Sequence, residues 1–349
     1  MSGIYIHIPF CKSRCNYCNF TSTTSISLID DYIKALSKEI HLRKNYLINT
    51  QYNTIYIGGG TPSCIPINKL YKIFEDIYKN YNIINNPEIT IEVNPDDITN
   101  KLIKQYKNTG INRISIGVQS LNNNILKLLN RRHNSAKAIR AIKIIQDNDI
   151  KNISADLIFN IPNDNSIYNS VNTLINLDVP HISIYSLTIE KNTPLWKNRK
   201  NFIIDEAQYI SQFKEIYNIL HSNNYINYEI SNYAKNELYS IHNSNYWKNL
   251  PYIGLGTAAH SYNIIQRQWN TSNILNYIKN LNNNKIPCKK ETLSKIDKYN
   301  EYVMLSLRTM WGCDLNYIKN IYGKDPFKNI ITKFKKFIDN NLMNINNNT

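Results

Sequence analysis

The stretch His7-Ile-Pro-Phe-Cys-Lys-Ser-Arg-Cys-Asn-Tyr-Cys-Asn-Phe20 places three cysteines in a C-x₃-C-x₂-C spacing, directly after a strand-like run. The sulfurs of Cys11, Cys15 and Cys18 can therefore converge on one cube of iron and sulfide. A [4Fe–4S] cluster normally takes four thiolates, so three leave one iron open to the amino and carboxylate groups of a small molecule. A structural zinc ion is the alternative, but it needs a fourth Cys or His nearby, and His7 is expected to face the sheet interior or to pack.

The rest of the composition describes an ordinary globular chain. The other cysteines, Cys64, Cys288 and Cys313, are scattered, so the six together do not form a disulfide scaffold. A length of 349 residues with 42% apolar content allows a large core, and we expect one large and one small domain. No segment has the pattern of a signal peptide or the length of a membrane span, so a cytoplasmic protein is expected.

The formal charge of +15 raises the question of a nucleic-acid partner. The basic residues are spread along the chain and do not form one stripe. The codons of an AT-rich genome favour Lys, Asn, Ile and Tyr and would give the same composition. We therefore expect no specific nucleic-acid partner, while incidental attraction to anionic lipids at a membrane surface stays open.

Short β-rich runs alternate with amphipathic stretches up to about residue 235, which predicts βαβ units around a parallel sheet. The strand-like runs are Gly3–Ile8, Thr54–Ile57, Ile89–Val93, Arg113–Ile116, Ile153–Phe159 and His181–Tyr185. Six such units predict an α/β fold with a partial (β/α)6 barrel over residues 1–235. Aromatic and Asn-rich loops around 245–262, followed by helical segments, predict a smaller, mainly helical domain over residues 236–349.

Several notable residues fall at the carboxyl ends of these strands, where parallel sheets carry their chemistry. Gly58–Gly60 lacks side chains and lets the backbone approach a ligand, although a tight turn would look the same. Glu92 and Asp156 could hold ribose hydroxyls or an ammonium group, or could be solvated loop carboxylates. Gln119 ends another strand, and Arg131 could pair with a ligand carboxylate.

The cysteine stretch resembles the signature of the radical S-adenosylmethionine (SAM) superfamily. The flanking His-Ile-Pro-Phe is similar to the branch that contains oxygen-independent coproporphyrinogen III oxidases and their heme chaperone relatives. Matches cover nearly the whole chain: Gly58-Gly-Gly-Thr-Pro-Ser63, Glu92-Val-Asn-Pro95, Gly117-Val-Gln-Ser120, Ile182–Glu190, Tyr228–Ala234 and His242-Asn-Ser-Asn-Tyr-Trp247. The family's chemistry is reductive cleavage of SAM by the cluster, which yields a 5′-deoxyadenosyl radical.

The resemblance implies a set of cofactor-binding residues. The cluster would use the three cysteines of the signature, and Tyr17 could lie against the adenine or pack within the loop. The other residues implied to bind SAM are Tyr5, Gly59, Gly60, Thr61, Glu92, Gln119, Arg131 and Asp156. Two segments near the expected SAM site depart from the family pattern. Asn160-Ile161-Pro162 replaces a Gly-Leu-Pro turn, which Asn tolerates at positive φ, and Gly254–Ala259 contains fewer glycines than in relatives.

Two features favour a heme carrier over an oxidase. Phe20 stands where oxidases carry a further cysteine, and only ten residues precede Cys11 where oxidases have a long arm. The His242 motif matches that of the heme chaperones, and a neutral imidazole is a good heme ligand. Without the resemblance, such a histidine is more often hydrogen-bonded in a loop beside core aromatic residues. His260 and Cys313 are further candidate ligands, although residues of these types are more often structural.

The resemblance thus implies a heme chaperone that delivers heme to respiratory hemoproteins, with homodimerisation left open. The alternatives are an oxygen-independent coproporphyrinogen III dehydrogenase and, from charge alone, a radical enzyme acting on nucleic acid. Relatives continue with a Leu-Thr-x-x-Gly segment where this chain reads Asn341-Leu-Met-Asn-Ile-Asn346. The C-terminal domain is therefore expected in a shortened form.

Overall fold

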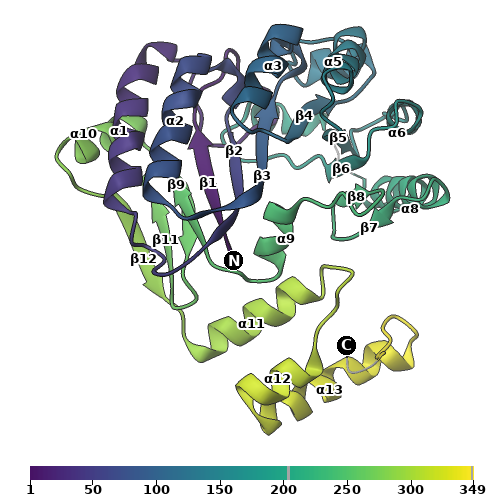
Figure 1. Cartoon of the computed structure of the whole chain (residues 1–349). Coiled ribbons are helices and arrows are strands. Elements are labelled where there is room, and N and C mark those ends of the chain that lie inside the picture. Colours follow the sequence, from purple (N-terminus) through teal and green to yellow (C-terminus); the bar gives the residue numbers. More distant parts are fainter. Residues whose placement is uncertain (203–204, 347–348) are drawn as a thin grey trace.

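The six predicted strands form the parallel centre of a single twelve-stranded sheet (Figure 1). The computed structural model describes residues 1–202, 205–346 and 349. The central strands are β1 (Ser2–Ile8), β2 (Tyr52–Gly59), β3 (Ile83–Val93), β4 (Arg113–Gln119), β5 (Asn152–Phe159) and β6 (His181–Ser186). Each predicted strand is confirmed, and together they give the α/β architecture with a parallel central sheet expected from the sequence.

Alternation along the strands separates a core face from a cavity face. On β4, Ile114, Ile116 and Val118 are buried in the main hydrophobic core, and on β1 Ile4 and Ile6 do the same. The intervening residues face the opposite side of the sheet and are mostly polar. The barrel interior is therefore built from side chains that can bind polar ligands.

Helices connect the strands and cover their core face. They are α1 (Ile29–Leu42), α2 (Ile67–Asn80), α3 (Asn100–Asn108), α4 (Asn123–Leu128), α5 (Ser135–Asp147), α6 (Ile167–Asn176), α7 (Pro194–Lys197) and α8 (Glu206–Ser222). Side-chain caps set some of the starts: Thr99 accepts a hydrogen bond from the Leu102 amide, and Asn134 accepts one from Lys137. Most of them pack their apolar faces into the same core as the strands, whereas α4 and α7 contribute Ile125, Leu128 and Leu195 to a second, smaller cluster.

The sheet continues across the domain boundary that we predicted at residue 235. Strand β9 (Tyr252–Leu255) pairs parallel to β1, and β10 (His260–Tyr262), β11 (Gln266–Asn270) and β12 (Cys288–Thr292) extend it antiparallel. At the other edge lie β8 (Asn232–Ala234) and β7 (Ile226–Asn227). Part of the segment expected as loops is thus strand, because pairing with β1 selects a conformation that its irregular polar pattern does not show.

A buried ion pair joins this extension to α1. Arg43 donates to Glu39 at 3.2 Å and to the carbonyl of Gly254 at 2.8 Å. The other carboxylate oxygen of Glu39 accepts from the amide of Gly256 at 2.8 Å and from the hydroxyl of Tyr277 at 2.6 Å. The extension therefore shares its interior with the barrel.

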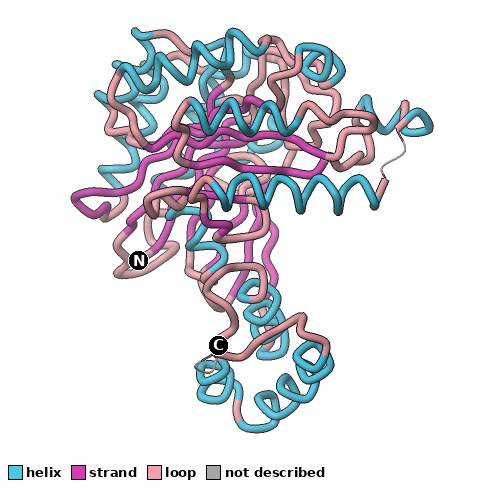
Figure 2. The backbone as a smooth tube through the Cα atoms, turned by 90° about the vertical axis from the view of Figure 1, so that its right-hand side faces the viewer, coloured by secondary structure: helices cyan, strands magenta, loops and turns pink. Residues whose placement is uncertain are grey.

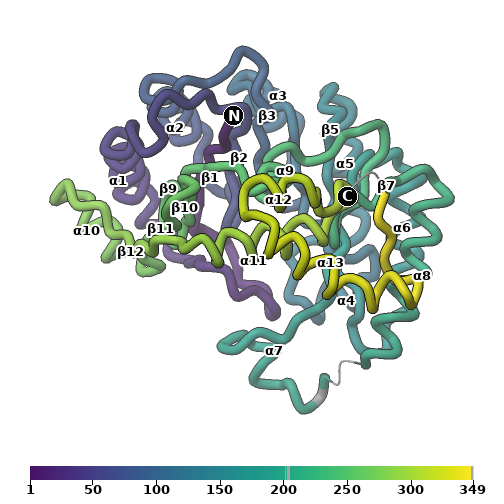
Figure 3. The backbone as a smooth tube through the Cα atoms, turned by 90° about the horizontal axis from the view of Figure 1, so that it is seen from below, coloured from purple at the N-terminus to yellow at the C-terminus, as the bar shows by residue number. Residues whose placement is uncertain are grey.

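The last helices form a separate cluster beneath the sheet. They are α11 (Lys295–Ser306), α12 (Leu315–Tyr322) and α13 (Lys324–Asp339), whereas α10 (Ile274–Asn282) packs against α1. Figure 2 shows the cluster below the strands, and in Figure 3, which is seen from below, α11, α12 and α13 lie over the middle of the molecule. It has its own small core, which includes Cys313, Leu315, Ile318, Ile330 and Phe334.

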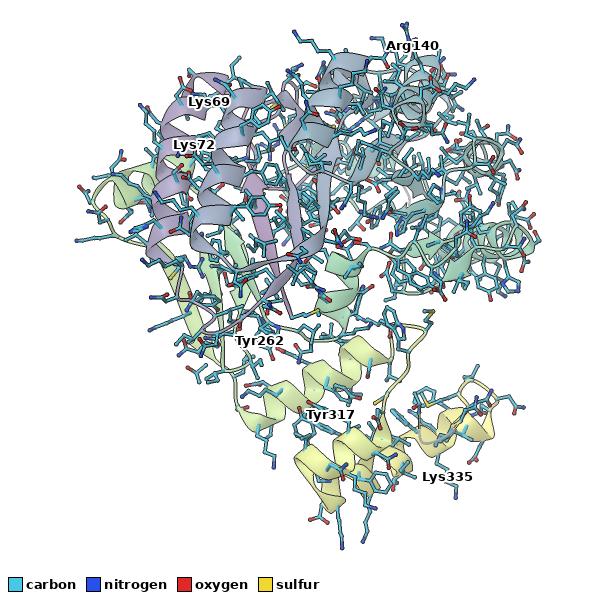
Figure 4. The ribbon with its side chains drawn as sticks, viewed as in Figure 1. Lys69, Lys72, Arg140, Tyr262, Tyr317 and Lys335 are labelled. Carbon is cyan, nitrogen blue, oxygen red and sulfur yellow. The ribbon has the colours of Figure 1, made fainter. Side chains whose placement is uncertain are left out.

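Basic side chains are distributed over separate helices of the surface. Figure 4 shows Lys69 and Lys72 on α2, Arg140 on α5 and Lys335 on α13. Within the residues described, no helix combines the length and the apolar character needed to cross a membrane.

Candidate functional site

A cavity of about 500 Å³ lies inside the barrel and opens at the cysteine loop. Its wall comes from that loop and from strands β2 to β6. It brings together most of the predicted site: Cys11, Cys15, Tyr17, Cys18, Gly59, Gly60, Thr61, Glu92, Gln119, Arg131 and Asp156. Tyr5 and His242 do not line it.

Backbone hydrogen bonds fix the cysteine loop over the mouth of the cavity. The Cys11 amide donates to the Thr23 carbonyl at 2.9 Å, and the Asn16 amide donates to the Leu129 carbonyl at 3.1 Å. All three thiols are free and partly buried. Burial raises the pKa of the Cys11 and Cys18 thiols, so both are protonated in the ligand-free chain.

Hydrogen-bond donors face the sulfurs. The Thr61 hydroxyl donates to Cys11 Sγ at 3.4 Å, and the Arg131 guanidinium donates to Cys15 Sγ at 3.3 Å. A Cβ at Gly60 would lie 3.0 Å from Cys11 Sγ. These contacts fit three thiolates that share a cluster, because donors stabilise negative charge on sulfur. Across the described ranges, no three His, Cys, Asp or Glu side chains are grouped closely enough to hold a metal ion.

The glycine triplet at the end of β2 is packed too closely for side chains. Gly59 has a φ of +114°, and a Cβ there would lie 2.7 Å from the ring of His7. A Cβ at Gly58 would lie 2.8 Å from a carboxylate oxygen of Glu92. The Gly60 amide donates to the Ile8 carbonyl, so the turn is joined to the end of β1 beside the cysteine loop.

Two carboxyl groups share one wall of the cavity. Glu92 accepts from the Tyr56 hydroxyl at 2.9 Å and from the Gly59 amide at 3.0 Å. Burial raises the pKa of Glu92 to about 7, with a further contribution from Asp156. Burial likewise raises the pKa of Asp156 to about 6, against hydrogen bonds from Ser183 and Ser115. Near neutral pH this wall can therefore gain negative charge when a cation enters the cavity.

Arg131 and Gln119 lie at an irregular point of β4. Gln119 has a φ of +65°, and the pairing with β5 shifts register between Gly117 and Gln119. Arg131 donates to the Gly117 carbonyl at 2.7 Å and to the side chain of Asn94 at 2.6 Å, which holds its guanidinium at the rim. A glutamine in the left-handed region costs free energy, and strained residues of this kind cluster at functional sites.

Tyr17 packs within the structure and also faces the cavity, so a role against the adenine stays a prediction. Its ring packs against a small apolar cluster that contains Leu129 and Ile158, and it also lines the cavity. Burial raises the pKa of its hydroxyl well above the usual value, so the group is protonated.

His242 lies beneath the cavity, and both of its ring nitrogens are hydrogen-bonded. Its Nδ1 is 2.8 Å from the Thr54 hydroxyl, and its Nε2 is 2.8 Å from the Tyr246 hydroxyl. Burial lowers the pKa of the imidazole to about 3, so the ring is neutral. It stacks on Tyr56, and Tyr5 stacks on the same ring. This is the geometry of a hydrogen-bonded histidine packed among aromatic residues.

The helix that carries His242, α9 (Ile241–Trp247), closes the lower end of the barrel (Figure 1). The amides of Ile241 and His242 donate to the Glu88 carboxylate at 3.0 and 2.9 Å. The next residue, Asn243, lines the cavity. Strand register could have identified the remaining interior residues, which sequence reasoning missed: Tyr56, Arg113, Ser115, Ser154, Ser183 and Tyr185.

The fold and the site define a class of protein. Residues 5–174 match the family model described as the Radical SAM superfamily. The structure superposes on the coproporphyrinogen III oxidase HemN of Escherichia coli, which is described as a radical SAM enzyme, with a TM-score of 0.87. That match covers 99% of this chain and 85% of the other at 19% sequence identity, so it shows a shared fold.

Proteins of similar sequence show which family of this superfamily the chain belongs to. The heme chaperone HemW of Buchnera aphidicola subsp. Schizaphis graminum is 37% identical over 86% of this chain and 81% of its own length. HemW of Bacillus subtilis is 30% identical over 93% of this chain and 88% of its own length. The chain belongs to the HemW family of the radical SAM superfamily, and membership of the superfamily implies a [4Fe–4S] cluster and SAM.

Proposed function

We propose that this chain is a heme chaperone, which binds heme and transfers it to respiratory hemoproteins. The proposal rests on the sequence identity of this chain to heme chaperones, which is higher than its identity to the oxidase. Identity is 37% to a heme chaperone over 81% of that protein, but 19% to the coproporphyrinogen oxidase whose fold it shares. The acceptors would be met in the cytoplasm or at the membrane surface, and a homodimer is compatible with the proposal.

The cluster would be held by Cys11, Cys15 and Cys18. Thr61 and Arg131 donate hydrogen bonds to two of these sulfurs and would stabilise the ligated thiolates. When bound, the cluster supplies the electron for reductive cleavage of SAM.

SAM would lie along the rim and wall of the cavity. Gly59, Gly60 and Thr61 would receive its amino group, Arg131 its carboxylate and Tyr17 its adenine. Gln119, Glu92 and Asp156 would contact the remaining polar groups, and Tyr5 would act through its stacking on Tyr56. Because SAM carries positive charge, its binding favours the ionised carboxylates and releases protons from this wall near pH 7.

Heme would take its iron ligand from His242 after the imidazole gives up one hydrogen bond, to Tyr246 or to Thr54. His260 is the second candidate, since it is exposed, its pKa is lowered by partial burial, and it stacks on Trp269. Cys313 is buried in the core of the C-terminal helices.

A second candidate function, oxidative decarboxylation of coproporphyrinogen III, is favoured by the fold shared with HemN. Against it, Phe20 lines the cavity mouth with 67% of its surface exposed, at the position where a further cysteine would mark an oxidase. An exposed aromatic ring at the mouth suits contact with a flat macrocycle.

Anaerobic reconstitution followed by heme titration tests the proposal. Absorbance should show stoichiometric heme binding, weakened in His242→Ala or His260→Ala according to which residue is the ligand. Cys11→Ala, Cys15→Ala and Cys18→Ala should each lose the [4Fe–4S] absorbance, whereas Cys288→Ala, far from the cavity on β12, should keep it. Absence of heme binding, or a complete cluster in all three variants, would overturn the proposal.

A further inference from the structure

Arg113, the first residue of β4, is a buried cation that lines the cavity. Only 1% of its surface is exposed, and its Nε has no hydrogen-bond partner. The arginine ion pairs among the described residues involve Arg43, Arg132 and Arg267, but not Arg113. The SAM-binding set proposed above does not use it.

A second buried arginine shows how the same fold satisfies such a group. Arg43, 4% exposed, pairs with Glu39 and donates to the Gly254 carbonyl and to the Ser261 hydroxyl at 2.8 and 2.9 Å. A buried charge that no counter-ion contacts destabilises the folded chain. An anionic group entering the cavity would remove that destabilisation at Arg113.

The groups around Arg113 are polar. Glu92 and Asp156 line the same cavity, and the charge of Arg113 partly opposes the rise that burial causes in the pKa of both carboxyl groups, but among the described residues neither forms an ion pair with it. Its register partners Thr90 on β3 and Asn152 on β5 point to the same face of the sheet. Thr90 Oγ1 and Asn152 Oδ1 are buried without hydrogen-bond partners. Two positions along the strands, the hydroxyls of Ser115 and Ser154 line the cavity. Thr90 and Asn152 do not line the cavity, and the hydroxyls of Ser115 and Ser154 are hydrogen-bonded to Asp156 and His181 at 3.3 and 2.8 Å. The cavity floor thus offers the guanidinium of Arg113, which lies outside the ion pairs of the described residues, and a guanidinium suits an oxyanion.

The floor is separate from the rim where Arg131 lies. Arg131 bonds the carbonyl of Gly117, four residues after Arg113 on β4, which corresponds to about 13 Å along the strand. A carboxylate beside the cysteine loop can therefore use Arg131, while Arg113 remains available for another one. Heme carries two propionate side chains, whereas SAM carries a single carboxylate.

We propose that the floor around Arg113 is a carboxylate subsite that receives a propionate of the bound heme. The proposal rests on the heme-chaperone function above. His242 lies close to this floor, since it stacks on Tyr56, and Thr90 is the register partner of both Tyr56 and Arg113. A heme that approached His242 would thus bring a propionate towards the guanidinium.

The test compares heme with heme dimethyl ester, which keeps the iron and the macrocycle but lacks both carboxylates. Arg113→Gln should bind heme about 10- to 100-fold more weakly than the wild type, as expected for loss of a charged hydrogen bond. Arg113→Lys should recover part of the affinity. The wild type should bind the diester weakly, and Arg113→Gln should not weaken that binding further.

Three results would overturn the subsite: equal heme affinity in Arg113→Gln, equal affinity of the wild type for heme and the diester, or loss of SAM binding with heme binding unchanged. The last result would assign the floor to the carboxylate of SAM. If the wild type bound neither heme nor the diester, the chaperone function itself would fail.

Thermal unfolding of the ligand-free variants separates ligand binding from a structural role. Arg113→Gln removes an unpaired charge, so its Tm should equal or exceed that of the wild type. Arg43→Gln leaves the carboxylate of Glu39 without its cation and should lower the Tm. A Tm loss in Arg113→Gln as large as that in Arg43→Gln would make Arg113 a structural cation and overturn the proposal.

Discussion

Replacing Glu92 by Gln should change how the stability of the ligand-free chain depends on pH. The pKa of Glu92 is about 7 in the folded chain, against 4.5 for an unburied glutamate, chiefly because of burial. The folded state therefore holds the proton more tightly than the unfolded state. The wild type keeps its full stability below pH 4.5 and loses the contribution of Glu92 as the pH rises through 7.

The magnitude follows from linkage. Between pH 5 and pH 8, a single carboxyl group with these two pKa values costs the wild type about 2.5 kcal/mol. Glu92→Gln does not ionise, so its free energy of unfolding relative to wild type should rise by about that amount over the same range. Urea unfolding at both pH values measures the difference, with exposed Glu215→Gln on α8 as the control. A difference between variant and wild type that is constant with pH would refute the reasoning.

Further predictions concern the residues that would bind SAM and the turn at Asn160. SAM affinity should increase from pH 5.5 to pH 8, as the carboxyl groups of Glu92 and Asp156 become ionised; equilibrium dialysis showing a flat profile would contradict this. Gly59→Ala should abolish SAM binding and lower the Tm, because φ is +114° and the new Cβ would meet His7, and an unchanged Tm would argue against that packing. Asn160→Gly should alter stability by less than about 1 kcal/mol, whereas Asn160→Val should cost more, because φ is +60°. Equal urea midpoints for the two Asn160 variants would contradict that reading.

The central fold could be predicted because each parallel strand carries a strong local signal. Ile153, Ala155 and Leu157 alternate with polar residues on β5, and capping residues such as Asn134 mark helix starts. Asn160 was expected to replace a turn glycine, and its φ of +60° confirms that the turn is kept. Strands β9 to β12 were missed, since β9 gains order from pairing with β1 and from the buried Glu39 network, and β10 to β12 gain order from pairing with β9 and with one another.

The candidate site was predicted in part. Motif spacing brought the cysteine loop, the glycine turn and the carboxylates to one cavity, because all follow strands that end at the same edge. It could not show that His242 has both nitrogens bonded or that Arg113 lacks a partner. These properties depend on contacts between residues distant in sequence, such as Thr54 with the ring of His242.

The most direct measurement gives the anaerobically reconstituted chain coproporphyrinogen III, SAM and a reductant, and gives the same preparation heme in a parallel titration. If the chain is a heme chaperone, heme will bind stoichiometrically and no protoporphyrinogen will accumulate. Formation of protoporphyrinogen at enzymatic turnover would contradict the chaperone function and assign the cavity to the oxidase reaction.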